Sequence, residues 1–392
     1  MTTPLPQVLK EQWIRDAFPV LNEVTYLNVG TYGIMPAPAL EEFQAIQAEF
    51  ERRGVASNGS FGQKCEETRQ RIAALISAAP EEIAFTRNAS DGINLVLAGI
   101  DWQPGDEVIT SEQEHEAVMH PLMYLHRTRG IQVKRVVVSP DAPEMQAHLN
   151  AALTARTRLV VISLVSCETG TRLPGQAISQ WAGQHNVLCL LDGAQVSGVI
   201  PVDVQALECD FYTSNGHKWL SGPKGSGFFY ARRDRLNQLS PAHVGAGSLQ
   251  QVDLFNQIAE PYLTGQRFEF GTRAWPIYAG LGASLDWFEK IGWERVYSHI
   301  AALSATLKEE ILRRPCLRLL TPLPFEQSSG LTTFVIEGQQ AADVSKVLRE
   351  SWKIYVRVIP HYNAIRISTA HFNLPDDINQ LMLALEQIET LQ

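Results

Sequence analysis

Segment 188–195 reads LCLLDGAQ, and segment 214–227 reads SNGHKWLSGPKGSG. The first is a short apolar run that ends in an acid, Asp192, and the second places Lys218 in a polar turn followed by glycines. A short apolar run bounded by turn residues is typical of a buried strand in a parallel sheet. The two segments therefore predict a sheet with an acid and a lysine close to its carboxyl edge.

An acid and a lysine so arranged match the needs of pyridoxal phosphate (PLP) chemistry. A lysine amine condenses with the cofactor aldehyde, and a carboxylate pairs with the protonated pyridine nitrogen. A lone lysine in a glycine-rich loop is more often a surface residue, but Asp192 changes this interpretation, because an acid among apolar residues needs a cation. Asp192 could instead cap a helix, which would leave Lys218 unexplained. Gln195 could donate to the phenolic oxygen of the cofactor.

The composition is that of an ordinary globular enzyme. The chain has 392 residues, 45% of them hydrophobic and 19% charged, and a net charge of −9. It has no basic run, which argues against nucleic-acid or membrane partners. The five cysteines are scattered without a Cys-x-x-Cys pair, so we expect no metal site and a reducing compartment. Without signal-peptide features or a long apolar run, a cytoplasmic protein is expected.

Short apolar runs alternate with amphipathic stretches, a pattern typical of parallel βαβ units with ligands at the carboxyl ends of the strands. Strands are expected at 82–86, 107–110, 133–138, 159–164, 187–191, 211–213 and 227–230. The segment 265–282 is expected to cross to a smaller α+β unit. That unit should contain helices at 278–312, 341–350 and 375–389 and strands at 330–337, 354–358 and 364–368.

Two further segments follow strands. TRNASDG at 86–92 could bind a phosphate at a helix N-terminus through Asn88, Ala89 and Ser90, or Ser90 could simply cap the helix. EQEHE at 112–116 contains His115, which could lie over a planar cofactor ring and carry a proton, or could be an ordinary loop histidine.

Several other polar side chains are candidate site residues only in combination with these motifs. Asn215 and His217 flank the lysine and could donate to the phosphate. The turn FEFGT at 268–272 offers the hydroxyl of Thr272. Arg357 and Arg366 lie on neighbouring predicted strands, and a guanidinium fork matches a substrate carboxylate, although either arginine could be a surface residue.

Taken together, these motifs resemble the class V aminotransferase family, fold-type-I PLP enzymes that include cysteine desulfurases, kynureninase and isopenicillin epimerase-like proteins. The resemblance runs from about residue 27 to the end of the chain. It implies an α/β fold: a large domain around a mainly parallel seven-stranded sheet and a smaller α+β C-terminal domain. The expected parts are an N-terminal arm at 1–20 that packs on the small domain, a PLP-binding domain at 21–264 and a small domain at 265–392.

The resemblance also implies site roles. Lys218 would bear the cofactor, Asp192 would hold the ring nitrogen, Gln195 would contact the ring oxygen and His115 would stack on the ring. The phosphate would be held by Ala89, Ser90 and His217, and Asn88 and Asn215 are further predicted cofactor contacts. Thr272 would reach the phosphate of a neighbouring subunit, which implies a homodimer with shared active sites. Arg366 would bind the substrate carboxylate.

Within the family, the chain is most similar to the cystine and cysteine C–S lyases. LNVGTYGIMP at 27–36 resembles their N-terminal glycine loop, in which Asn28 is a predicted substrate contact, and WPIYAGL at 275–281 also fits. Arg357 followed by Arg366 resembles their pair of arginines. Cysteine desulfurases carry a mobile sulfur-accepting cysteine near this region, but 357–363 reads RVIPHYN, and Cys316 is interpreted as structural. Two site residues depart from the family pattern: Cys167 replaces an asparagine, and Asn215 replaces a serine or threonine.

The sequence therefore predicts a PLP-dependent lyase that performs β-elimination on L-cystine, L-cysteine or a related S-substituted cysteine, giving pyruvate, ammonia and a sulfur product. Lys218 would remove the α-proton. The alternatives are a cysteine desulfurase or selenocysteine lyase, which would give alanine, and an epimerase or aminotransferase of the same family. A non-catalytic PLP-binding protein is a further alternative.

Overall fold

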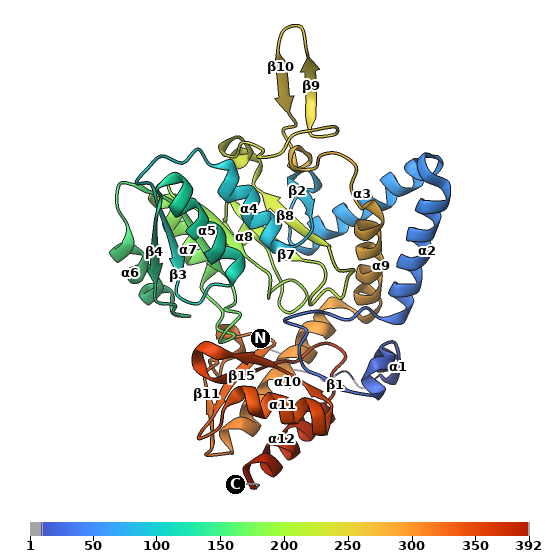
Figure 1. The fold of residues 1–392 in the computed structure, drawn as a ribbon, viewed down its shortest axis with the longest axis vertical. Helices are drawn as coiled ribbons and strands as arrows, with labels where there is room; N and C mark the ends of the chain where they lie inside the picture. Colours follow the sequence, from blue (N-terminus) through green and yellow to red (C-terminus); the bar gives the residue numbers. More distant parts are fainter. Residues whose placement is uncertain (1–8, 10, 391–392) are drawn as a thin grey trace, which may run out of the picture.

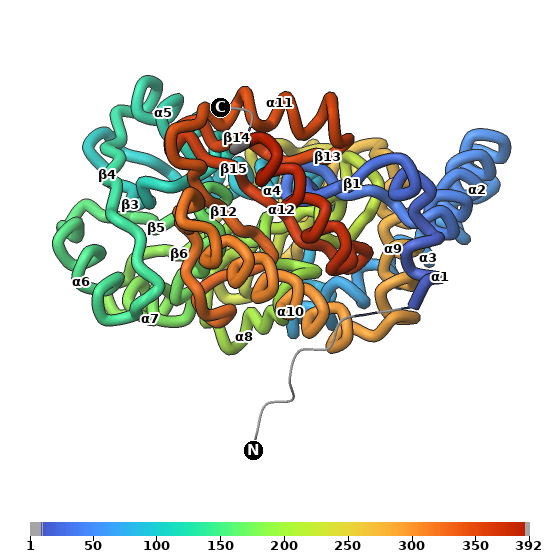
Figure 2. Tube along the Cα trace, turned by 90° about the horizontal axis from the view of Figure 1, so that it is seen from below, coloured from blue at the N-terminus to red at the C-terminus, as the bar shows by residue number. Residues whose placement is uncertain are grey.

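A computed structural model describes residues 9 and 11–390 (Figure 1). The larger unit is built around a seven-stranded sheet, and the smaller unit, drawn in orange and red, lies below it. Seen from below, the smaller unit lies in front of the green strands of the larger sheet (Figure 2).

The large sheet has the strand order β2-β8-β7-β6-β5-β3-β4. All neighbouring strands are parallel except β8, which runs antiparallel to both β2 and β7. The expectation of a mainly parallel seven-stranded sheet is confirmed. The strands are β2 (Ile83–Thr86), β3 (Glu107–Ser111), β4 (Gln132–Val136), β5 (Thr157–Ser163), β6 (Leu188–Asp192), β7 (Phe211–Asn215) and β8 (Gly227–Ala231).

Both faces of this sheet are covered, as its apolar strands require. On β5, Val160 and Ile162 belong to one buried cluster, whereas Leu159 and Val161 belong to another. Successive side chains of a strand point to opposite faces, so the two clusters are the cores of the two faces. The helices that join and cover the strands are α4 (Ala89–Gly99), α5 (Glu116–Arg129), α6 (Ala142–Ala152), α7 (Gly175–Gln184) and α8 (Val204–Leu207).

Two helices and a β-hairpin of the large unit were not predicted. α2 (Ala37–Arg53) and α3 (Asn58–Leu75) pack against α9 (Trp275–Ile291), and the hairpin of β9 (Leu249–Asp253) and β10 (Ile258–Pro261) projects from the top of the molecule (Figure 1). Gly280 lets α9 approach α2 closely, because a Cβ there would overlap the ring of Phe43.

The smaller unit is an antiparallel sheet of four strands in the order β11-β12-β15-β14, with three helices. Its elements are β11 (Leu317–Leu319), β12 (Leu331–Ile336), β14 (Arg357–Ile359), β15 (Ala364–Ser368), α10 (Trp293–Leu312), α11 (Ala341–Trp352) and α12 (Pro375–Thr390). The single strand expected at 354–358 is wrong. β13 (Ile354–Tyr355) pairs with β1 (Thr25–Tyr26), and β14 pairs with β15.

The helix expected at 278–312 is also two helices, because Gly292 between α9 and α10 has φ +95. Since α9 packs on α2 and α3, a boundary near residue 292 fits the packing better than one at 265. The division into domains stays a proposal.

The N-terminal arm lies against the smaller unit and α9 in its described part. Arg15 of α1 (Gln12–Asp16) forms an ion pair with Asp377 at 3.0 Å, and the rings of Trp13 and Trp287 lie 5.1 Å apart. Residues 1–8 and 10 of the predicted arm lie outside the described residues. Short 3₁₀ turns occur at Pro19–Asn22, Gly54–Ser57, Pro80–Glu82, Arg233–Gln238, Gly265–Phe268, Phe325–Gln327 and Pro360–Tyr362. No helix in the described chain combines the length and apolar character needed to cross a membrane.

Candidate active site

The candidate site lies where the carboxyl ends of the parallel strands meet the smaller unit. Asp192 ends β6 and pairs in register with Ser163, the last residue of β5. Lys218 lies on the loop after β7. Arg366 lies on β15 of the smaller unit, and its Nη1 donates to the carbonyl oxygen of Cys167 at this edge, at 2.6 Å. The fold thus collects the predicted residues from both units, as parallel sheets do at this edge.

Asp192 is a buried carboxylate that forms no ion pair with any residue that the structure describes. Its side chain accepts one hydrogen bond, from the N–H of Ala194 at 2.9 Å, and no described lysine, arginine or histidine forms an ion pair with it. Burial raises the pKa of Asp192, while the Ala194 N–H and the Lys218 ammonium act to lower it. Because a buried carboxylate is stabilised by a cation, this position fits the protonated ring nitrogen of PLP.

The amine of Lys218 forms no hydrogen bond within the described chain. Burial is the largest cause that lowers the pKa of Lys218, and the Arg366 cation acts in the same direction, whereas Asp192 and Cys167 raise it. A lowered pKa increases the share of neutral amine, which is the form that condenses with an aldehyde.

His115 is held by the start of α5. Its Nδ1 accepts the N–H of Ala117 at 3.0 Å, so in the neutral ring Nε2 carries the proton. The residue is exposed, but the surrounding protein still removes part of the water around its ring. This desolvation is the largest cause that lowers the pKa of His115 to about 4, and the Lys218 cation lowers it further. The ring is therefore neutral at neutral pH and has an open face for stacking on a planar ring.

The start of α4 is arranged as an anion site. Asn88 caps this helix by accepting from the Asp91 N–H at 2.9 Å. The alternative that Ser90 is the cap is therefore wrong, because Asn88 has the extended backbone of an N-cap, whereas Ser90 lies in the first turn. Neither the N–H nor the hydroxyl of Ser90 donates a hydrogen bond within the described chain. A helix N-terminus with free donors favours a phosphate.

Asn215 and His217 reach this helix end from the lysine loop. Asn215 Oδ1 accepts the N–H of Ala89 at 2.9 Å, so this side chain holds the helix start as an acceptor and keeps only its amide N–H groups for a phosphate. His217 Nδ1 lies 3.3 Å from the carbonyl oxygen of Ser226, which leaves Nε2 as the nitrogen that a ligand can reach.

Gln195 has a structural role that the sequence did not reveal. Its Nε2 donates to the Gly30 carbonyl at 2.9 Å, and its Oε1 accepts from the Trp219 indole at 2.8 Å. The amide therefore ties the N-terminal glycine loop to the lysine loop. One N–H of Gln195 remains for the ring oxygen.

The glycine loop contacts the lysine loop through its backbone. The N–H of Gly33 donates to the His217 carbonyl at 2.9 Å, and Lys224 donates to the Gly33 carbonyl at 2.6 Å. A Cβ at Gly33 would overlap the carbonyl oxygen of Lys218, so the close approach requires glycine.

Arg366 is a buried cation with no carboxylate partner among the described residues. Its side chain is 4% exposed, Nη2 donates to Thr31 Oγ1 at 3.3 Å, and Nε has no partner. Thr31 in turn donates to Asn28 Oδ1 at 2.8 Å. Burial lowers the pKa of Arg366 to about 10, so it stays charged at neutral pH and suits a substrate carboxylate. Arg357 is the register partner of Arg366 on β14 but is exposed.

Thr272 is not brought into this group. It is exposed, and its hydroxyl forms no hydrogen bond within the described residues, while Arg273 beside it donates to the Phe85 carbonyl at 2.7 Å. Glu114, by contrast, was not predicted from the sequence and lies at this edge, where its carboxylate accepts from Ser163 at the end of β5. Its position directly before His115 was the available signal.

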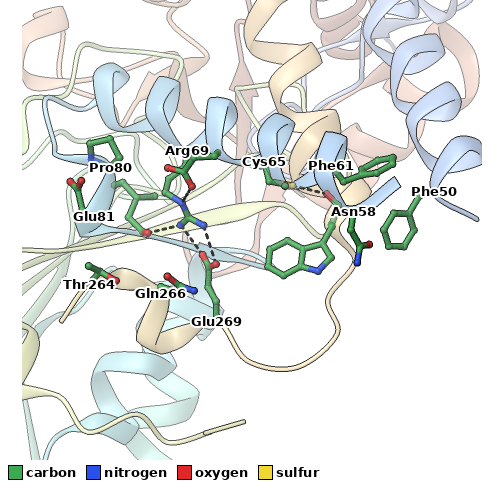
Figure 3. A pocket seen from close by; sticks show the side chains of 14 residues that line it. Phe50, Asn58, Phe61, Cys65, Arg69, Pro80, Glu81, Thr264, Gln266 and Glu269 are labelled. Carbon is green, nitrogen blue, oxygen red and sulfur yellow. Dashed lines mark hydrogen bonds and ion pairs between the residues drawn. The ribbon is translucent and has the colours of Figure 1, made fainter. Parts of the chain in front are cut away.

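A separate cavity of about 500 Å³ lies between α2, α3 and the segment 264–275 (Figure 3). Arg69 and Glu269 line it and form a two-contact ion pair of 2.8 and 3.0 Å, and Glu269 also accepts from the Phe85 N–H. It contains none of the predicted site residues, and this pair of charges is already neutralised.

A lysine with a lowered pKa, a buried carboxylate, a neutral imidazole and a helix N-terminus define the site of a PLP enzyme of fold type I. Residues 37–381 match the family model described as aminotransferase class-V, and the chain belongs to this family. It is therefore an enzyme, and PLP is its cofactor.

The relatives cover almost the whole chain. A cysteine desulfurase of Serratia proteamaculans is 31% identical over 96% of this chain and 98% of the relative. A probable cysteine desulfurase of Methanothermobacter thermautotrophicus is 28% identical over 97% and 98%.

Two solved structures are of C-DES. One is a lysine-to-alanine variant with glycine covalently linked to its PLP cofactor (TM-score 0.87, 30% identity, 95% of this chain and 98% of that chain). The other is described as the cystine C–S lyase in complex with its reaction product cysteine persulfide (TM-score 0.86, 31% identity, 94% and 98%).

Proposed function

We propose that this chain is a PLP-dependent carbon–sulfur lyase that performs β-elimination on L-cystine, L-cysteine or a related S-substituted cysteine. The products would be pyruvate, ammonia and a sulfur compound. The likeness to the cystine C–S lyase C-DES and to the cysteine desulfurases supports cleavage at a cysteine carbon–sulfur bond.

One observation favours the lyase over the desulfurase outcome. The rim segment 357–363 contains no cysteine, and Cys167 is the cysteine that interacts with Lys218 and Arg366. Burial raises the pKa of Cys167 to about 11, so its thiol is protonated at neutral pH and is a poor acceptor of sulfur. The sulfur atom therefore leaves the substrate Cβ together with the group already bonded to it, and is not transferred to a cysteine of the protein.

The residues divide the work as follows. When bound, PLP supplies an electron sink conjugated to the substrate Cα. Arg366 binds the α-carboxylate with its fork, Lys218 removes the α-proton, and His115 and Asp192 orient the ring by stacking and by charge. Arg357 adds a second positive charge at the rim, which complements the distal carboxylate of cystine.

Desulfurase chemistry is the second candidate, because the curated relatives carry that name. The two are separated by incubating the purified protein with L-cystine, L-cysteine, S-methylcysteine and selenocysteine and identifying the products by mass. The lyase gives pyruvate and ammonia, and the desulfurase or selenocysteine lyase gives alanine. A keto acid that retains the substrate side chain, or a D-amino acid, would instead indicate an aminotransferase or epimerase. Lys218→Ala is the inactive control.

We further propose a cytoplasmic homodimer with shared active sites. The exposed Thr272, next to Phe270 with 41% of its surface exposed, supports a role for this turn toward a second copy. Mixing an inactive Lys218→Ala chain with a Thr272→Ala chain tests this, because a shared site would give mixed dimers an activity different from that of either parent. Light scattering reports the mass of the assembly.

A further inference from the structure

Glu114 is a buried carboxylate that joins the ends of β3 and β5. Its Oε1 accepts from Ser111 Oγ at 2.6 Å and from the Ser163 N–H at 3.0 Å, and its Oε2 accepts from Ser163 Oγ at 2.6 Å. The side chain is 8% exposed, and no described lysine, arginine or histidine forms an ion pair with it. The chain thus holds a second buried acid at the edge of its cofactor site.

The hydrogen bonds place Glu114 beside Asp192. Ser163, which donates to Glu114 twice, is the register partner of Asp192 on the adjacent strand, and the N–H of Leu164 donates to the Asp192 carbonyl at 2.9 Å. Two acids so placed repel each other when both are ionised, unless a cation is bound close to them.

Among the described residues, few titratable groups lie near Glu114. They are its chain neighbour His115, Cys167 after β5 and Asp192 at the end of β6; Lys218 acts on both Cys167 and Asp192, and Glu112 and Glu116 of the same loop are exposed. Burial is the largest cause that raises the pKa of Glu114 to about 7, and the Asp192 charge adds to it, while Ser111 and Ser163 lower it.

We infer that Glu114 is a positioning residue whose ionisation sets how strongly Asp192 holds a cation at the cofactor ring nitrogen. With Glu114 ionised, two negative charges attract that cation, and with Glu114 protonated only Asp192 does. The serine hydroxyls rotate and can donate to the carboxylate or accept from the acid, so the change of state requires no rearrangement of the backbone. This inference rests on the proposed role of Asp192.

The test is the affinity for PLP of the full chain stripped of cofactor, measured by equilibrium titration from pH 5.5 to 8.5 without substrate. At low pH, Glu114→Gln should bind as tightly as the wild type, because Glu114 is then protonated. At high pH the variant should bind about tenfold more weakly, since one pKa unit of coupling corresponds to tenfold. A ratio of affinities that is constant with pH would overturn the inference.

Glu107→Gln is the matched control. Glu107 is also buried, 3% exposed, and starts the strand that Glu114 follows, but it is held by Thr154 and Lys134 at the opposite edge. It should show the wild-type pH profile. If Glu107→Gln changes the pH dependence of PLP affinity as much as Glu114→Gln does, any buried charge on β3 has this effect. That result would overturn the specific role of Glu114.

The variant Asp192→Asn distinguishes a failure of the proposed role of Asp192 from a failure of the inference about Glu114. If this variant binds PLP as the wild type does at every pH, the role of Asp192 fails and the inference falls with it. If Asp192→Asn weakens binding while the ratio for Glu114→Gln stays flat, only the inference fails. In the double variant the effect of Glu114→Gln should shrink, because without Asp192 the ring nitrogen holds less positive charge for Glu114 to attract.

Ser163→Ala tests the same idea without removing the acid. Loss of one hydroxyl donor raises the pH at which Glu114 ionises, so the midpoint of the pH-dependent affinity should move upward. This variant serves if Glu114→Gln does not fold, and an unchanged midpoint contradicts the inference.

Discussion

Arg366 of the smaller unit donates from Nη1 to the carbonyl oxygen of Cys167 in the larger unit, at 2.6 Å. The contact holds a buried guanidinium at the edge of the large sheet, with its Nε left without a partner. This guanidinium has no carboxylate partner among the described residues, and the α-carboxylate of an amino-acid substrate would supply one.

Arg366→Ala is therefore expected to lower kcat/KM for the amino-acid substrate by at least about 100-fold, which is the scale of a lost charged hydrogen-bonding pair. The retained PLP, measured by absorbance, should stay near the wild-type level. The exposed Arg357→Ala is the comparison and should lose less. Equal kcat/KM for wild type and Arg366→Ala contradicts the assignment.

Asp192→Asn should make the cofactor-free protein more stable at pH 8 by about 1–3 kcal/mol, because it removes a buried charge that forms no ion pair within the described residues. It should also weaken PLP binding. Urea unfolding with and without cofactor measures both effects. Asp106→Asn is the control, since Asp106 is paired with Arg158 at 3.2 Å and its loss should destabilise. If urea unfolding shows that cofactor-free Asp192→Asn is less stable than the wild type, the interpretation of Asp192 as an unpaired charge is contradicted.

Gly33→Ala should displace the glycine loop, because its Cβ would meet the carbonyl oxygen of Lys218. We expect weaker PLP retention and a fall in thermal stability. Gly59→Ala on α3 has no atom within 4 Å of the new Cβ and should be neutral or slightly stabilising. Identical behaviour of the two variants in cofactor retention would show that the loop contact does not matter.

The pH dependence of stability gives a further prediction. The pKa of Glu114 is about 7 in the folded chain, above its ordinary value of 4.5. A carboxyl whose pKa is raised by folding binds more protons in the folded state between these values, so stability falls as pH rises from 4.5 to 7. The cofactor-free Glu114→Gln protein should lose this component, up to about 3 kcal/mol, in urea unfolding across the window. An unchanged slope would contradict the raised pKa.

The sequence revealed what depends on local patterns. The strand before Asp192 and the turn around Lys218 are short and self-contained, so their positions were predictable. Contacts between distant segments were not. Gln195 bonds to Gly30, 165 positions away, and the exposed hairpin of β9 and β10 lacks the apolar alternation that marks a strand. The role proposed for Thr272 requires contact with a second copy of the chain.

The central claim is that the amine of Lys218 carries the cofactor. Borohydride reduction of the PLP-loaded protein, followed by peptide mass analysis, tests it most directly. We predict that the cofactor mass is found on the peptide containing Lys218, and that Lys218→Ala carries none and releases no pyruvate from cystine. A cofactor attached to another lysine, or turnover by Lys218→Ala at the wild-type rate, would contradict the account.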